Sequence, residues 1–232
     1  EELAKNKKII DSIEIIEKNK EAEKALSESI VQSQKTSIRD SYVSDSANKS
    51  NLKKEFGVFS GSAQGKRKFV SMENSLMKVC FSNQGGRIYS VTLKNYKTFD
   101  SLPLKLFDGD STIFGLGLSS IGRTTNDLFF TQMSNEEKIV VEGSDKSLKY
   151  RLVTDNGSYI EYTYTLSPDK YMVKFDVSFS GLSDVITDKY LTLNWELFVP
   201  GLEKGKKWEN DNTILHFQYY EDEDDYLNPR ND

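Results

Sequence analysis

The chain has 232 residues, of which 37% are hydrophobic and 29% are charged, enough for one sizeable folded domain or for a domain with an additional tail. Its net charge of -5 excludes a cationic surface that would collect nucleic acid along the whole chain. No apolar run approaches the roughly 20 residues of a membrane span, and no signal segment follows Glu1. We therefore expect a cytosolic protein, or one whose export and anchoring segments lie outside this chain.

Residues 1–55 form a charged segment without glycine, proline, phenylalanine or tryptophan. Three isoleucines follow one face of a helix, at Ile9, Ile13 and Ile16. We expect a marginally stable, solvated helix over residues 3–32 and a flexible, serine-rich linker over residues 33–50. The whole segment is thus predicted to be a helical or flexible tether. A coiled-coil or docking helix is the alternative, although no heptad pattern persists.

After residue 55 the apolar pattern changes to alternation with a period of two, which is typical of β-strands. Expected strands cover residues 69–73, 76–82, 88–94, 112–118, 138–142, 147–154, 158–166, 171–179, 188–198 and 213–220. Gly85-Gly86 and Asn156-Gly157 mark tight hairpins, because such turns need positive φ angles. Many short strands without intervening helical patterns predict an antiparallel β-sandwich or barrel over residues 56–232.

The single cysteine, Cys80, and the single histidine, His216, limit the available chemistry. They exclude an internal disulfide, a site with several cysteine ligands and a histidine cluster. We expect Cys80 to be a small strand residue rather than a nucleophile, since an active thiolate needs a neighbouring base or cation. The sequence places no carboxylate next to His216 for acid–base work. We therefore predict no catalytic residue, no metal and no cofactor.

The remaining polar and aromatic features favour structure over chemistry. The acidic run of residues 221–225 has no fixed geometry for a cation and predicts a solvated loop. The lysines between Lys204 and Lys207 are expected on a turn. Gly115-Leu116-Gly117 predicts a strand that another backbone approaches closely. Of the two tryptophans, we expect Trp195 in the core, because it lies within an apolar strand, whereas Trp208 could lie in the core or at its rim.

The segment from Phe69 to Tyr96 resembles the first strands of the YidC periplasmic domain. There, a strand of the form E-N-x-L-x-V-x-F-S-x-x-G-G leads into V-x-L-K-x-Y-K. The matching positions are Glu73, Asn74, Leu76, Val79, Phe81, Ser82, Gly85, Gly86, Val91, Leu93, Lys94, Tyr96 and Lys97. Two later segments are also similar, Pro103–Asp110 and Tyr162–Val173. The Asp11-Ser12-Ile13 tether looks like the Bacteroidetes branch of this family.

The resemblance covers about residues 56–220 and implies a fold and a role. The implied fold is an antiparallel β-supersandwich, related to galactose mutarotase. Its structural family motif is expected at Asn74, Phe81, Gly85, Gly86, Leu93 and Tyr96. The implied role is that of a non-catalytic domain on the periplasmic face of the bacterial inner membrane, between the first two transmembrane helices of an insertase and chaperone. The chain is expected to end before the family's last sandwich strands.

The resemblance also implies partners. These are nascent membrane proteins and the Sec translocon, reached through the parent insertase. A peptide or a glycan could occupy a groove or edge of the sandwich, whereas nucleic acid is not expected. Contact with the membrane is expected only through transmembrane segments outside this chain. Two alternatives from other classes are an exported carbohydrate-binding or mutarotase-like module and an exported adhesin or structural β-protein.

Overall fold

The computed structural model describes residues 48–110, 112–187, 190–218 and 223–228. The chain divides into two units between Lys54 and Glu55. The predicted tether lies outside the described residues up to residue 47. Residues 48–54 are helical, so the linker predicted to reach residue 50 is wrong at its last three positions. The physical reason is the following Leu-Lys-Lys run, which has high helix propensity.

The second unit contains a five-stranded sheet with the order β4-β3-β2-β1-β8. Its strands are β1 (Phe69–Glu73), β2 (Met77–Ser82), β3 (Arg87–Lys97), β4 (Pro103–Asp108) and β8 (Lys138–Val140). All neighbours are antiparallel except β1 and β8, which run parallel. The hairpin predicted at Gly85-Gly86 is confirmed, because both glycines have positive φ angles, of 78° and 58°. One face buries alternate residues of β1 and β2, which are Val70, Met72, Met77, Val79 and Phe81.

A second sheet has the order β11-β10-β9-β7 and is antiparallel throughout. Its strands are β7 (Thr131–Gln132), β9 (Lys146–Val153), β10 (Tyr159–Leu166) and β11 (Val173–Ser180). Asn156-Gly157 connects β9 to β10, and Gly157 has a φ of 86°, so this hairpin is also confirmed. Alternate side chains of β9 and β10 are buried, as the two-residue period predicts. The edge strand β11 has no neighbouring strand on its outer side among the described residues.

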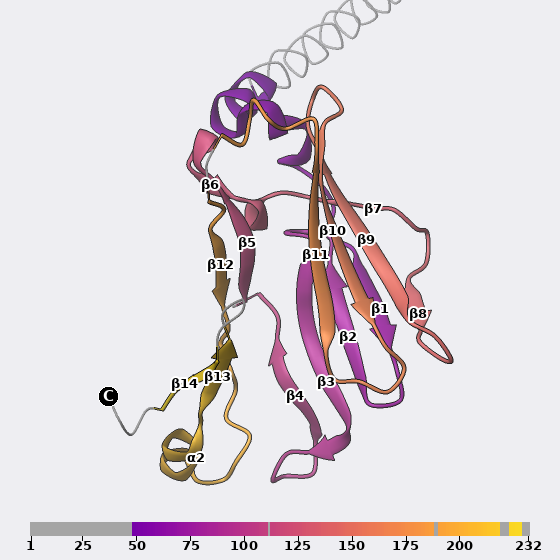
Figure 1. Cartoon of the computed structure of the whole chain (residues 1–232), viewed down its shortest axis with the longest axis vertical. Coiled ribbons are helices and arrows are strands. Elements are labelled where there is room, and N and C mark those ends of the chain that lie inside the picture. The colour runs from indigo at the N-terminus through magenta and orange to yellow at the C-terminus, as the bar shows by residue number, and fades with distance from the viewer. Residues whose placement is uncertain (1–47, 111, 188–189, 219–222, 229–232) are drawn as a thin grey trace, which may run out of the picture. The chain divides into compact units, whose positions relative to one another are not determined.

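These two sheets face each other and enclose the core (Figure 1). The Phe81 ring of β2 lies 4.9 Å from the Tyr164 ring of β10. The Tyr164 hydroxyl donates a hydrogen bond to the Gly86 carbonyl oxygen at 2.7 Å. Aromatic rings therefore fill the space between the sheets, and the buried phenol finds a partner in the opposite turn. The predicted all-β antiparallel sandwich is confirmed, with the β1–β8 pair as its parallel exception.

A third, smaller sheet has the order β12-β5-β6. Its strands are β5 (Ile113–Leu118), β6 (Arg123–Thr124) and β12 (Leu193–Glu196). Short 3₁₀ turns accompany the sandwich at η1 (Gly57–Ser62), η2 (Ser119–Ile121) and η3 (Thr125–Asp127). The close backbone approach predicted at Gly115 is confirmed, since a Cβ there would lie 2.8 Å from the Asn126 nitrogen. Glycine is therefore required where η3 crosses β5.

The C-terminal described segment corrects three predictions. A short helix, α2 (Lys206–Asn212), replaces the turn expected around the lysines. The acidic run is not all loop, because β14 (Asp224–Leu227) begins within it and pairs with β13 (Leu215–Gln218). The pairing with β13 stabilises this strand by more than the repulsion between its adjacent carboxylates destabilises it. Trp195 is not in the core, since 62% of it is exposed on the edge strand β12.

No helix within the described part of the chain is long and apolar enough to cross a membrane.

Candidate functional site: an apolar groove beside β11

Asn74, the first residue of the predicted family motif, fastens two turns together. Its side-chain oxygen accepts hydrogen bonds from the backbone nitrogens of Leu76 and Met77 at 2.9 and 2.8 Å. Its amide group donates to the carbonyl oxygens of Ser167 and Lys170, both at 2.8 Å. Only 3% of Asn74 is exposed. Two of these bonds thus close the β1–β2 turn, and the other two hold it against the β10–β11 turn.

The other motif residues lie along the first sheet and do not meet in one cavity. Phe81 is in the core, and the two glycines form the β2–β3 turn. A Cβ on Gly86 would lie 2.8 Å from the Phe130 ring. Leu93 is half-buried and pairs with Met77 and Leu104 in neighbouring strands. Tyr96 is exposed at the end of β3, with its ring 6.3 Å from that of Tyr171. Their contacts hold turns and sheets rather than a ligand.

Cys80 and His216 lie in separate sheets and form no pair. Cys80 is a free, half-buried thiol on β2, and burial raises its pKa. His216 lies on β13, with its ring 5.8 Å from that of Tyr226 on β14. Within the described ranges, no cluster of three or more histidine, cysteine, aspartate or glutamate side chains could hold a metal ion.

Two carboxylates on the sandwich are held by pairs of cations. Glu161 accepts from the Lys149 Nζ at 2.8 Å and from the Arg151 Nε at 2.6 Å. These hydrogen bonds, led by the one from Lys149, lower the pKa of Glu161. Glu73 is paired with Lys138 and with Lys94, and the hydrogen bond from Lys138 is the main cause of its lowered pKa. Each cluster combines one carboxylate with two cations of the same sheet and keeps a net charge of +1, and its ion pairs join different strands, the arrangement expected of sheet stabilisation.

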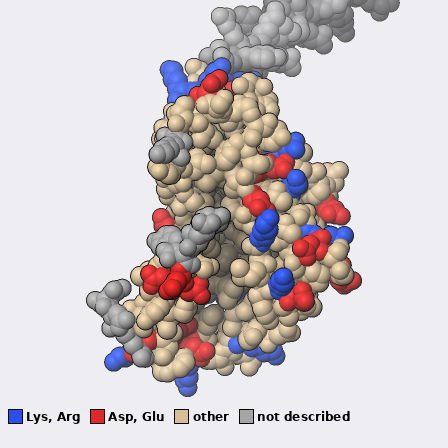
Figure 2. All heavy atoms as spheres, in the orientation of Figure 1, with Lys and Arg blue, Asp and Glu red and all other residues tan. Residues whose placement is uncertain are grey.

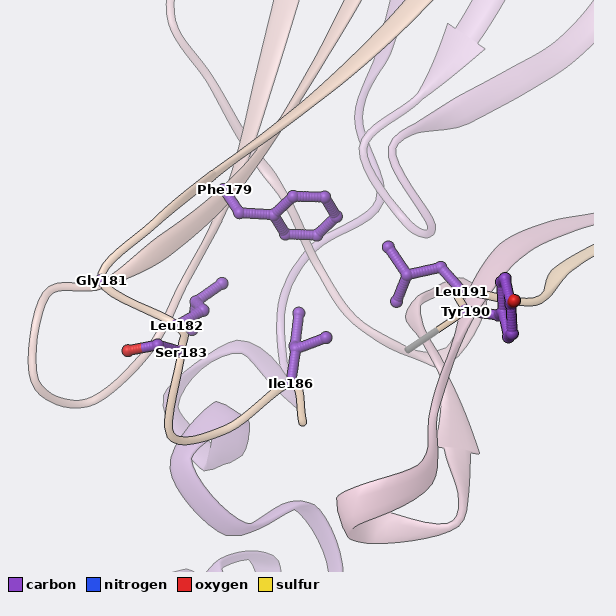
Figure 3. A pocket seen from close by; sticks show the side chains of 7 residues that line it. All are labelled: Phe179, Gly181, Leu182, Ser183, Ile186, Tyr190 and Leu191. Carbon is purple, nitrogen blue, oxygen red and sulfur yellow. The ribbon is translucent and has the colours of Figure 1, made fainter. Parts of the chain in front are cut away.

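Two apolar cavities lie beside β11, and together they are called the groove. At one end a cavity of about 610 Å³ lies between Phe179 of β11 and Leu191. Figure 3 shows Leu182 and Ile186 pointing into the same space, whereas the hydroxyl of Ser183 points away. In the space-filling view (Figure 2), a hollow opens lower on the molecule, between the segment with β13 and β14 and the sandwich.

A second cavity, of about 230 Å³, lies farther along β11 and is bounded by β11 and the small sheet. Val173 and Phe175 of β11 line one side, and Leu193 and Trp195 of β12 line the other. The Phe114 ring of β5 joins the two sides, because it lies 5.0 Å from the Phe175 ring and 5.8 Å from the Trp195 ring. The smaller cavity therefore has β11 on one side and the β12–β5 pair on the other, and Ile88 of β3 and Phe107 of β4 complete its lining.

The side chains that line the groove are mostly apolar and suit binding rather than catalysis. Among its described lining residues, the ionisable side chains are the phenols of Tyr164 and Tyr190. Burial raises the pKa of Tyr164 far above its usual value, so this phenol remains protonated. Thr112 also lines the smaller cavity and is 2% exposed, yet its hydroxyl has no hydrogen-bond partner among the residues that the structure describes. A buried, unsatisfied hydroxyl is costly, which marks this end of the groove as one that a polar group could complete.

A third hollow, of about 1040 Å³, is more polar and lies between residues 61–69 and 129–137. Its most prominent cation, Arg67, is already paired with Asp110 at 2.6 Å and also donates to Gln84. Lys66 and Lys68 also line this hollow, so it suits a polar or anionic ligand, whereas the groove suits an apolar one.

Sequence reasoning missed the groove residues. Trp195 is expected in the core, Val173, Phe175, Phe179 and Leu193 fall in expected strands, and Phe107, Leu182 and Ile186 fall in none of them. A signal was present in the alternation Val173, Phe175, Val177 and Phe179, but alternation alone does not show whether another sheet covers that face.

Comparison with known proteins agrees with the fold and the motif. The model of the YidC periplasmic domain family matches residues 70–223. The chain is 30% identical, over its whole length, to the membrane protein insertase YidC of Bacteroides fragilis, and it covers 35% of that protein. It is 34% identical to the same protein of Parabacteroides distasonis, over 79% of this chain and 29% of that protein.

A third relative, the membrane protein insertase YidC of Phocaeicola vulgatus, is 32% identical over 98% of this chain and 34% of its own length. The chain thus spans about a third of the length of these relatives. The family match covers most of the second unit, including both sheets of the sandwich. The chain belongs to the YidC periplasmic domain family.

Proposed function

We propose that this chain is a non-catalytic accessory domain of a membrane protein insertase, located on the periplasmic face of the inner membrane. Its clients would be nascent membrane proteins, and it would act alone or beside the Sec translocon. In this proposal the membrane-embedded part of the longer protein performs insertion, and the β-domain supplies a binding surface and a scaffold.

The observation that carries the proposal is the groove beside β11. Its walls are Phe175, Phe179, Leu193 and Trp195, and they offer apolar contact rather than an acid, a base or a nucleophile. Nascent membrane proteins are rich in apolar segments. A surface of this kind suits an accessory role in handling them. The names of the three relatives support the insertase assignment.

Deletion of most of residues 56–232 from the full insertase tests the accessory role. We expect insertion of model membrane proteins and cell growth to remain largely intact, since the reaction would belong to the membrane core. Loss of growth with normal amounts of the deleted protein would contradict the proposal. Sequencing the parent reading frame provides a second test, with one apolar span expected upstream and about five downstream.

Carbohydrate binding is the second candidate, and one observation favours it. Trp195 is exposed and lies edge-on to Phe114 at the smaller cavity, an arrangement in which a sugar ring could stack. A sugar ligand should change the Trp195 fluorescence in a Trp208→Phe variant, in which Trp195 is the remaining tryptophan. No response across a broad panel of glycans would remove this candidate.

A further inference from the structure

We propose that the polar hollow, the space between residues 61–69 and 129–137, binds an organic phosphate ester through the ammonium groups of Lys66 and Lys68. This inference goes beyond the proposed function and does not depend on it, because it concerns a different part of the second unit. Figure 1 shows β7 and β8, which flank the 133–137 loop, on the side of the sandwich away from β12, β13 and β14. Three features lead to the inference: two available cations, a fixed backbone that carries them, and a large space with an aromatic floor.

The first feature is the pair of lysines. Lys66 and Lys68 line the polar hollow and are exposed, and neither ammonium group forms an ion pair with an acidic side chain in the described part of the chain. The cation between them, Arg67, is already used, because its guanidinium group binds Asp110 and Gln84. The positive charge available to a ligand is therefore that of two ammonium groups.

Two lysines without an available arginine favour a phosphate over a carboxylate. An arginine guanidinium group matches a planar carboxylate with two parallel hydrogen bonds, whereas a lysine ammonium group acts as a point charge from any direction. A phosphate ester carries a charge of about -1.5 to -2 at pH 7, and its terminal oxygens point in different directions. One phosphate group can therefore accept hydrogen bonds from both lysines and balance both charges.

The second feature is the fixed backbone that carries the lysines. The side-chain oxygen of Asn83 accepts a hydrogen bond from the Lys68 backbone nitrogen at 2.6 Å, and its amide group donates to the Lys66 carbonyl oxygen at 3.1 Å. The Asn83 backbone nitrogen donates to the Lys68 carbonyl oxygen, also at 3.1 Å. Asn83 thus holds both lysine backbones against the β2–β3 turn. A ligand would therefore meet a segment that is already ordered, which reduces the entropy lost on binding.

The third feature is the size and lining of the polar hollow. Its volume of about 1040 Å³ is at the upper end of the range for sites that hold whole organic molecules, so a bare phosphate ion would fill only a small part of it. The half-buried ring of Phe129 lines it, and Gly65 packs so closely on this ring that a Cβ would lie 2.7 Å away. Gln64, Ser134 and Asn135 add amide and hydroxyl groups. This lining suits a phosphate ester with a hydroxylated organic part.

Isothermal titration calorimetry on the whole chain tests the inference with matched probes. Glucose 1-phosphate carries the phosphate ester, glucuronate carries a carboxylate on the same kind of ring, and glucose carries no charge. We expect glucose 1-phosphate to bind most tightly and glucose not to bind. Vesicles of phosphatidylcholine, with and without phosphatidylglycerol, present a phosphate ester as a lipid headgroup. Binding to the phosphatidylglycerol vesicles identifies a lipid as the source of the ester, whereas binding of glucose 1-phosphate alone identifies a soluble one.

Three variants locate the binding site. Lys68→Gln should weaken binding of the phosphate ester roughly tenfold, because it removes a charged hydrogen-bond donor. Lys97→Gln is the matched control, since Lys97 is an equally exposed lysine at the end of β3 and does not line the polar hollow. Glu137→Gln should strengthen binding roughly twofold, because Glu137 is a lining carboxylate that repels an anion. All three side chains are exposed, so the variants should fold, which circular dichroism would verify.

Several outcomes would overturn the inference. Glucuronate that binds as tightly as glucose 1-phosphate would remove the preference for phosphate. Equal effects of Lys68→Gln and Lys97→Gln, on either the soluble ester or the vesicles, would show attraction to the general surface charge rather than to the polar hollow. A chain that binds neither the soluble ester nor the vesicles has no such site. Each result concerns the polar hollow and leaves the deletion test of the accessory role unaffected.

Discussion

The Tyr164 hydroxyl and the Gly86 carbonyl oxygen form a hydrogen bond of 2.7 Å that joins the second sheet to the β2–β3 turn of the first. Removing the hydroxyl in Tyr164→Phe leaves a buried carbonyl oxygen without this donor. We expect the free energy of unfolding to fall by about 1–2 kcal/mol. Tyr159→Phe is the control, because Tyr159 is only half-buried and its ring lies against Arg151, and it should change stability by less than about 0.5 kcal/mol. Urea unfolding followed by circular dichroism measures both; equal effects would show that the inter-sheet bond contributes little.

Asn74→Ala should destabilise the domain more strongly, by about 2–4 kcal/mol, because it removes four hydrogen bonds from a buried position. Ser75→Ala is the neighbouring control, since its hydroxyl makes one exposed hydrogen bond, to the Pro168 carbonyl oxygen. Urea midpoints of the two variants give the comparison. If Asn74→Ala were no more destabilising than Ser75→Ala, the connection between the two turns would not be a major contribution to stability.

Gly86→Ala and Gly157→Ala separate backbone strain from steric conflict. Both glycines have positive φ angles, which cost an alanine about 1 kcal/mol. Around Gly157 there is open space, whereas a Cβ on Gly86 would meet the Phe130 ring at 2.8 Å. We expect a loss of about 1 kcal/mol for Gly157→Ala and about 2–4 kcal/mol for Gly86→Ala. Thermal unfolding of the pair tests this order, and a reversed order would contradict the packing described for the turn.

Glu161 should make stability depend on pH. Its pKa in the folded chain lies below the ordinary value of 4.5, chiefly because of the hydrogen bond from Lys149. The carboxylate therefore contributes stability above the unfolded-state pKa, and this contribution disappears as the pH falls through the folded-state pKa. We expect Glu161→Gln to be less stable than the original chain at about pH 7 and nearly equal to it at about pH 2. Urea midpoints measured across this range would show no convergence if the ion pairs contributed nothing.

The sandwich could be predicted because its strands alternate and its two sharpest turns contain glycine. Successive side chains of a strand point to opposite faces, so Val79 and Phe81 are buried and Lys78 is exposed. This alternation can be read from the sequence of the strand alone. Trp195 was wrongly placed because an apolar strand is typical of a core only when a second layer covers it. In this chain β12 lies at the edge of a sheet with its tryptophan exposed. Such non-local relationships cannot be read from a single strand.

The same reasoning applies to β4 and β14, which sequence patterns did not reveal. β4 starts at Pro103 and carries charges at Lys105 and Asp108, so its sequence is typical of an exposed edge strand rather than of a core strand. β14 contains adjacent aspartates that favour a loop by local propensity. Its pairing with β13 is a tertiary contact that overrides that propensity.

The parallel pairing of β1 with β8 has a consequence for the order in which the domain folds. β1 to β4 are neighbours in the chain and in the sheet, so they can assemble as each hairpin closes. Ser71, however, pairs with Lys138, and this pairing must wait until the long intervening segment has been synthesised and collapsed. Until then the far side of β1 is an open edge on a nascent sheet. We expect this edge to be the last to gain protection in hydrogen exchange during refolding, and the point at which a slowly folding chain would meet another.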